Sequence, residues 1–170
     1  MKKIYIGKYL LAAFLLLGCL ITYFIWQFTG DSRDEALIER VLTNLCKDMS
    51  KESGENPALA LVKIKSAAGA FDYPVTLSME KYVNGSFNEE SVIAHAGRLR
   101  AMLNEAEFQY SDLHLELLSP ESARGFFSGC FEGYNKSGFL ERVVKDVSIE
   151  FVKIDGQWKI KQVEFVNILH

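Results

Sequence analysis

The spacing of apolar residues changes twice along the chain. Residues 9–28 carry no charge, residues 38 to about 104 place apolar side chains three and four positions apart, and from Phe108 onward apolar and polar residues alternate. Helical side chains repeat about every 3.6 residues and strand side chains every two. The pattern therefore predicts one long apolar helix, then three amphipathic helices, then a series of strands.

Cap signals precede each of the three amphipathic helices. Two of them have the spacing of a capping box, and the third is an Asn-Pro step, which suits the start of a helix. These signals are Ser32 with Glu35, Ser86 with Glu89, and Asn56 with Pro57. The helices are predicted to begin after Ser32, Asn56 and Ser86 and to reach about Met49, Ala68 and Asn104.

The alternation of apolar and polar residues predicts one short strand before the third helix and four long strands after it. Their predicted ranges are about 75–79, 108–119, 123–134, 139–154 and 158–168. Asn84-Gly85 and Asp155-Gly156 are predicted turns, the second suited to a two-residue hairpin. The alternation slips between Ile160 and Val163, which indicates a β-bulge.

One predicted strand has an unusual face made of glycine. Gly125, Gly129 and Gly133 are four residues apart and share a side of the strand. Repeated glycine predicts either strong bending or the close approach of a packed helix. Three helices on one side of a bent antiparallel sheet would make an α+β domain covering residues 29–170.

The uncharged segment 9–28 is long enough to cross a bilayer. Its 20 residues would form a helix of about 30 Å, the thickness of the hydrocarbon core. Lys2, Lys3 and Lys8 precede it, whereas acidic residues begin only at Asp31. The positive-inside rule then predicts a cytoplasmic tail over residues 1–8, a single-pass membrane anchor, and a domain outside the cytoplasm, with a bacterial inner membrane facing the periplasm as the expected setting.

Two alternatives to this anchor stay open. Leu16-Leu17-Gly18-Cys19 resembles a lipoprotein cleavage box, although the apolar run continues beyond Cys19. A cleaved secretory signal is the other alternative, although the run is longer than the usual apolar core and no small-x-small site follows it. The permanent anchor is the interpretation that fits the length of the run.

Charge and cysteine content narrow the classes of partner. Of the 19 Lys and Arg residues only three precede Asp31, and all 22 Asp and Glu residues lie from Asp31 onward, so the domain carries a net charge of −6. That charge repels phosphate backbones and argues against nucleic-acid binding. Cys46 and Cys130 are either a disulfide pair in an oxidising compartment or two unrelated thiols, and we favour the unrelated thiols.

The order of elements, together with the segment from Lys153 to Ile160, resembles the nuclear transport factor 2-like superfamily. That segment reads KIDGQWKI and is similar to the hairpin that closes many such domains. The resemblance implies helices on the concave face of a strongly curved sheet, with a cavity between them. It implies no single activity, since similar folds serve isomerases, dehydratases, ligand-binding proteins and assembly modules.

Three residues are candidates for lining such a cavity. His95 lies beside the apolar stripe of the third helix, where a buried base or a hydrogen-bonded core histidine would sit. His114 and Glu132 could act as a base and its orienting carboxylate, or could belong to a solvated outer face. The superfamily's acid–base pairs have no matching positions, so no catalytic residue is assigned. No metal-ligand spacing or phosphate loop occurs, so no metal or cofactor is expected.

Two functions remain in competition. The favoured one is a membrane-anchored, non-catalytic interaction or assembly module outside the cytoplasm, which binds the lipid bilayer and a protein partner or a second copy of itself. The alternative is a protein of the same fold with a small-molecule pocket, either a carrier or an isomerase- or hydrolase-like enzyme.

The predicted topology can be tested with intact cells or spheroplasts. Added protease should digest the carboxyl-terminal domain, because the lysines before residue 9 retain the amino terminus inside. The measurement is immunoblotting of a carboxyl-terminal tag beside a known exterior control. A domain left intact while the control is digested would contradict the assigned compartment.

Overall fold

The computed structural model describes residues 32–79, 83–135, 137–138 and 140–166. The chain divides into two units, Met1–Ala36 and Leu37–His170, and the second contains the folded domain. The predicted anchor at residues 9–28 lies outside the described residues. Within the described ranges, no helix is long and apolar enough to cross a membrane.

Three helices occur where the sequence predicts them. They are the helix 32–49, α2 at Pro57–Ala68 and α3 at Glu89–Met102. Asn56 caps α2 as predicted, because its side chain accepts a hydrogen bond from the backbone N–H of Ala58.

The predicted cap of α3 is wrong. Asn88, and not Ser86, accepts a hydrogen bond from the N–H of Ser91 at 2.9 Å. Ser86 is unavailable because it lies in a strand, opposite Thr76. Asn84 and Gly85, predicted as a turn, belong to that same strand.

Six strands form one sheet in the order β2-β1-β6-β5-β4-β3. Their bounds are Phe71–Met79 for β1, Val83–Phe87 for β2, Leu103–Ser119 for β3, Ser122–Asn135 for β4, Leu140–Ile154 for β5 and Gln157–Val166 for β6. β3 begins directly after α3, five residues earlier than predicted, because Leu103 and Glu105 already pair with β4.

The expectation of a wholly antiparallel sheet is wrong at one junction. β1 runs parallel to β6, with Leu77 opposite Val163, whereas every other pair of neighbouring strands is antiparallel. Parallel neighbours need a long crossover, and here β2, α3 and three further strands intervene. The sheet is therefore mixed.

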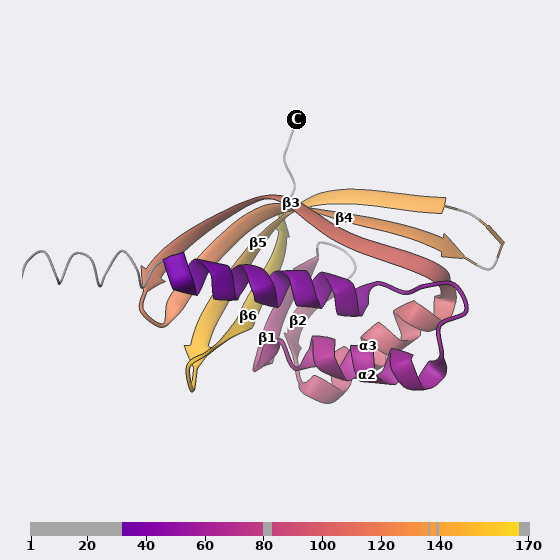
Figure 1. The fold of residues 1–170 in the computed structure, drawn as a ribbon, viewed down its shortest axis with the longest axis horizontal. Helices are drawn as coiled ribbons and strands as arrows, with labels where there is room; N and C mark the ends of the chain where they lie inside the picture. Colours follow the sequence, from indigo (N-terminus) through magenta and orange to yellow (C-terminus); the bar gives the residue numbers. More distant parts are fainter. Residues whose placement is uncertain (1–31, 80–82, 136, 139, 167–170) are drawn as a thin grey trace, which may run out of the picture. The chain divides into compact units, whose positions relative to one another are not determined.

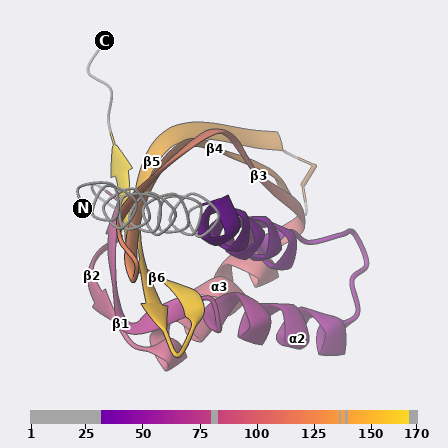
Figure 2. The same cartoon turned by 60° about the vertical axis from the view of Figure 1, so that its left-hand side comes forward.

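The strands curve around the helices, which cover the concave side of the sheet (Figure 1). Figure 2 looks almost along the helix 32–49 and shows β3, β4 and β5 arching over it, with α2 and α3 beneath. Ile38 and Leu42 of the helix are buried against Ile149, Phe151 and Ile160 of the sheet. The predicted α+β architecture, with three helices on a strongly curved sheet, is confirmed.

The hairpin between β5 and β6 forms as the sequence predicts. Asp155 and Gly156 both have positive φ, 50° and 77°, as a two-residue type I′ turn requires. The predicted bulge is also present. Glu150 lies opposite Gln162 and Phe151 opposite Ile160, so β6 has one extra residue at this point.

The glycines of β4 allow neighbouring strands, not a helix, to approach closely. A Cβ on Gly125 would lie 2.9 Å from Cγ2 of Ile149 in β5 and 3.2 Å from Cδ2 of Leu115 in β3. Both neighbours come from adjacent strands and fill the space above the glycine on the concave face. The prediction of bending is in keeping with the curved sheet, but the prediction of a helix approach is wrong.

Two alanine substitutions at glycine should change stability in opposite directions. Gly125→Ala should lower the free energy of unfolding by about 1–3 kcal/mol, because the branched side chain of Ile149 cannot move away cheaply. Gly97→Ala in α3 should raise it by about 0.5–1 kcal/mol, because nothing lies within 4 Å and alanine favours helix. Denaturant unfolding measures both. Equal effects would contradict the packing described for β4.

Candidate functional site

Aromatic side chains pair with one another on the concave face of β3 and β4, towards one edge of the sheet. The rings of Phe108 and Phe131 lie 4.9 Å apart, and those of Tyr110 and Phe127 lie 5.9 Å apart. The hydroxyl of Tyr110 lies 2.9 Å from the hydroxyl of Thr43 on the helix 32–49. Tyr110 and Phe127 are partly buried and pack against the hydrophobic core, so these contacts join helix to sheet.

An open groove lies beside this core, between the helix 32–49, the carboxyl-terminal end of α2 and the β5–β6 hairpin. Its volume is about 480 Å³, which falls within the usual range for small-molecule sites. The lining residues are Leu37, Arg40, Val41, Asn44, Leu45, Asp48, Ser66, Gly69, Ala70, Gly156, Gln157, Trp158 and Lys159.

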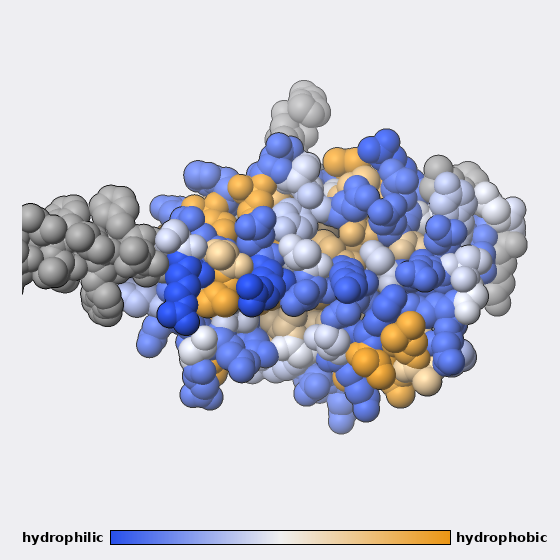
Figure 3. Space-filling model, viewed as in Figure 1, coloured by the Kyte–Doolittle hydropathy of each residue, from blue (hydrophilic) through white to orange (hydrophobic). Residues whose placement is uncertain are grey.

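Two parallel rows of side chains form the helical wall of the groove. Residues four apart on a helix are neighbours on its surface, and this spacing occurs twice among the lining residues. The apolar row consists of Leu37, Val41 and Leu45, and the polar row of Arg40, Asn44 and Asp48. Figure 3 shows hydrophilic side chains along this helix across the middle of the view. The wall is therefore amphipathic along its length.

The hairpin wall is anchored by a buried tryptophan. Trp158 is only 4% exposed, and the ammonium of Lys153 lies 5.3 Å from the centre of its ring. The ammonium of Lys159 donates a hydrogen bond to the carbonyl of Gly69, at the end of α2. A cation is favoured there by the free carbonyls of the helix terminus. These contacts fix the hairpin against α2 and hold the groove open on that side.

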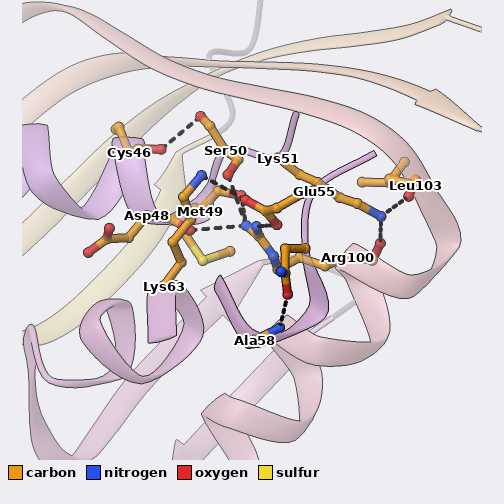
Figure 4. A network of polar contacts seen from close by, with 11 residues as sticks. Cys46, Asp48, Met49, Ser50, Lys51, Glu55, Ala58, Lys63, Arg100 and Leu103 are labelled. Atoms are coloured by element: carbon orange, nitrogen blue, oxygen red, sulfur yellow. Dashed lines mark hydrogen bonds and ion pairs between the residues drawn. The ribbon is translucent and has the colours of Figure 1, made fainter. Parts of the chain in front are cut away.

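A buried ion pair fixes the far end of the helical wall (Figure 4). The guanidinium of Arg100 in α3 binds the carboxylate of Glu55, and their side chains are 5% and 1% exposed. Lys63 of α2 lies 2.7 Å from the other carboxylate oxygen. Arg100 Nη1 also donates to the carbonyls of Asp48, Met49 and Ser50, at 3.0, 2.8 and 3.0 Å. One side chain thus pairs three carbonyls that the end of a helix leaves without partners.

The loop between the helix 32–49 and α2 is also bound to the end of α3 through Lys51. The ammonium of Lys51 donates to the carbonyls of Arg100 and Leu103, at 2.8 and 2.6 Å, where α3 passes into β3. The backbones of Lys51 and Ala106 exchange two hydrogen bonds as well. The end of the helix 32–49, the start of α2 and the end of α3 are therefore tied to one another.

The environment of Glu55 makes this linkage dependent on pH. Burial alone would raise the pKa of its carboxyl group, but hydrogen bonds and charge from Lys63 and Arg100 lower the pKa below the ordinary value of 4.5. A carboxylate with a lowered pKa in the folded state stabilises the fold fully above its unfolded pKa. That contribution is lost as the pH falls through the folded pKa.

The structure does not bring the three predicted site residues together. His95 is exposed on α3, where Nδ1 lies 2.7 Å from the carbonyl of Ser91 and the ring packs edge-on against Phe87 at 5.6 Å. His114 and Glu132 lie on the convex face, His114 opposite Phe126 and Glu132 opposite Glu107. Glu132 pairs with Arg142 at 3.1 Å.

His114 does border a smaller hollow on the outside of the sheet. This hollow has a volume of about 350 Å³, and its polar lining includes Asp112, Ser128 and Asp146. Ser128 donates to the carboxylate of Asp146 at 2.8 Å. Within the described part of the chain, no group of three acidic, His or Cys side chains is placed to hold a metal ion.

The two cysteines of the domain are free thiols. Burial raises the pKa of Cys46 to about 11, so this thiol stays protonated near neutral pH and is a poor nucleophile. Cys46 also provides a carbonyl that accepts from the hydroxyl of Ser50 at 2.8 Å. Its position therefore fits a packing residue.

Comparison with known proteins identifies the fold and nothing finer. No family model and no curated protein sequence matches the chain. Solved structures do match, including a putative scytalone dehydratase from Novosphingobium aromaticivorans, with a TM-score of 0.69 and 13% identity over 82% of this chain and 87% of that one. The domain has a nuclear transport factor 2-like fold.

Two further structures show how varied the neighbours of this fold are. A hexachlorocyclohexane dehydrochlorinase from Novosphingobium barchaimii has a TM-score of 0.65 and 13% identity, covering 82% of this chain and 93% of that one. A putative calcium/calmodulin-dependent protein kinase II association domain from Xanthomonas campestris has a TM-score of 0.58 and 14% identity, covering 81% and 87%. At such identities the likeness extends to the fold alone.

Sequence reasoning missed the groove, although part of its signal was visible. The helical spacing of the apolar residues predicts the first helix, but it does not separate the apolar row from a core stripe or the polar row from a solvated surface. The i, i+4 spacing of Arg40, Asn44 and Asp48 was available from the sequence. What faces them, namely the end of α2 and the hairpin turn more than 100 residues later, was not.

Removing one member of the buried ion pair should destabilise the fold strongly. Arg100→Met leaves the Glu55 carboxylate buried beside Lys63 alone, and it should lower the free energy of unfolding by about 3–5 kcal/mol. The double variant Arg100→Met with Glu55→Leu should be more stable than Arg100→Met, because no uncompensated carboxylate remains. Denaturant unfolding at neutral pH measures both.

Glu55→Gln provides the matched pH control for this pair. Below about pH 4.5 the wild-type free energy of unfolding should fall more steeply than that of Glu55→Gln, because only the wild type must protonate this buried carboxylate. Two results would show that the pair does not stabilise the fold as described. One is that the free energies of unfolding of the wild type and Glu55→Gln have the same pH dependence, and the other is that the double variant is no more stable than Arg100→Met.

Proposed function

We propose that the domain is a small-molecule-binding protein whose site is the groove between the helix 32–49, α2 and the β5–β6 hairpin. The observation that carries this proposal is the amphipathic helical wall, in which an apolar and a polar row border the same hollow of about 480 Å³. Small-molecule sites typically combine a mostly apolar lining with a few polar groups that orient the ligand.

The lining is suited to binding more than to proton transfer. Its titratable side chains are Arg40, Asp48 and Lys159, and it includes no His, Cys or Glu. Lys159 is already engaged with the carbonyl of Gly69. General acid–base catalysis needs a donor and an acceptor poised near the working pH and aimed at one reacting atom. The proposal is therefore a binding or carrier role.

The competing hypothesis of an interaction module has weaker support. Apolar side chains are exposed on α2, where Leu59, Leu61 and Val62 are 49%, 50% and 63% accessible (Figure 3). The packed aromatic interior also suits a module. However, this patch is a group of apolar side chains on one exposed helix, whereas the groove combines a hollow with apolar and charged lining residues. The membrane anchor, the location outside the cytoplasm and a protein partner remain predictions from the sequence.

Filling the groove should abolish ligand binding without unfolding the protein. Asn44→Trp adds bulk on the polar row, whereas Lys47→Trp places the same side chain on the same helix away from the lining. The full chain in mild detergent is screened against a panel of small carboxylates, amines and zwitterions by thermal unfolding. A ligand that binds the groove should raise the unfolding temperature of the wild type and Lys47→Trp, but not of Asn44→Trp.

Two outcomes of this screen would overturn the proposal. In the first, hits stabilise Asn44→Trp as strongly as the wild type, which places their site elsewhere. In the second, no member of the panel stabilises the wild type and no small molecule copurifies with it when the protein is extracted and analysed by mass spectrometry.

A further inference from the structure

The polar row of the groove carries opposite charges at its two ends. Arg40 and Asp48 are eight residues apart on one helix face, which corresponds to about 12 Å along the helix axis. Asn44 lies between them and offers both a donor and an acceptor. Neither Arg40 nor Asp48 forms a side-chain ion pair with any residue that the structure describes. Two charges facing one hollow are therefore available to a ligand.

The two ends differ in how firmly they are held. The carbonyl of Asp48 accepts from Arg100 Nη1 at 3.0 Å, so the buried ion pair fixes the backbone at the acidic end. Asp48 is half-buried, whereas Arg40 is exposed. The acidic end is preorganised, and preorganisation lowers the entropic cost of binding. The basic end has the reach to adapt to the position of a ligand's anionic group.

Apolar side chains flank the polar row on both sides of the groove. Leu37, Val41 and Leu45 run beside the polar row, and Ala70 and Trp158 line the opposite wall. Packing of an apolar ligand body against these side chains would remove water from both surfaces. A ligand that matches the whole groove thus has an apolar body and a polar edge.

The geometry points to an elongated zwitterion as the ligand class, with an anionic group paired to Arg40, a cationic group paired to Asp48, and an apolar body of about 12 Å between them. This inference rests on the proposed function, since it names the chemistry recognised by the same groove. The other cation of the lining, Lys159, is occupied by the Gly69 carbonyl, which leaves Arg40 as the principal partner for an anion.

Three matched probes test this charge pattern. The zwitterionic probe is a biphenyl with a carboxylate at one end and an aminomethyl group at the other. The two single-charge probes are the biphenyl carboxylate and the aminomethyl biphenyl. Calorimetric titration of the full chain in detergent, with detergent alone as the blank, should give a zwitterion affinity about three- to tenfold higher than that of either single-charge probe.

Neutralising each end of the row should remove one part of this preference. Arg40→Gln should lower the affinity for the zwitterion and the carboxylate about three- to tenfold and leave the aminomethyl probe unchanged. Asp48→Asn should lower the affinity for the zwitterion and the aminomethyl probe by a similar factor and leave the affinity for the carboxylate unchanged. Lys47→Gln, on the same helix but off the lining, is the control and should change none of the three affinities.

The outcomes separate this inference from the proposed function. If the carboxylate binds as tightly as the zwitterion and Asp48→Asn has no effect, the groove recognises an anion only and the inference is wrong. If no probe binds while another molecule still shows the loss in Asn44→Trp described above, the ligand class is wrong but the groove remains a binding site. If nothing binds in a way that Asn44→Trp prevents, the proposed function fails first.

Discussion

The buried pair of Arg100 and Glu55 is the contact on which the arrangement of the three helices depends. Each helix end leaves backbone groups without partners, and here one guanidinium serves three carbonyls of the helix 32–49 while binding a carboxylate from the following loop. Lys63 brings α2 into the same cluster. Taking such charges out of water is costly unless they are paired and hydrogen-bonded. The relative placement of the helices consequently pairs both charges and three backbone carbonyls, although Nε of Arg100 is buried without a hydrogen-bond partner among the described residues.

That placement also creates the groove. The helix 32–49 is held on one side by Ile38 and Leu42 in the core and at its end by Arg100. Its neighbouring side, with the apolar and polar rows, is left to face α2 and the hairpin across a gap. The hairpin is kept in place by Lys159 and the buried Trp158. Asp48 belongs both to the groove lining and to the set of carbonyls that Arg100 binds, so the groove and the buried ion pair are linked at this residue.

The fold by itself leaves the choice between binding and assembly open. Similar structures include a putative dehydratase, a dehydrochlorinase and a putative association domain. In this chain, Phe108, Phe131, Tyr110 and Phe127 pack together on the concave face of β3 and β4. Aromatic packing at that point strengthens the contact between sheet and helix. The groove lies on the other side of the helix 32–49, against α2 and the β5–β6 hairpin, and none of these aromatic residues lines it.

Local rules read from the sequence determined the helices, the Asn56 cap, the Asp155-Gly156 turn and the bulge after Ile160, because each depends on residues within one or two turns of chain. The tertiary structure decided the rest. The parallel pairing of β1 with β6, the convex position of His114 and Glu132, and the burial of Arg100 with Glu55 all depend on partners dozens of residues away. The periodicity of the sequence predicts which side chains share a face of a helix or strand, but only tertiary packing determines which residues that face contacts.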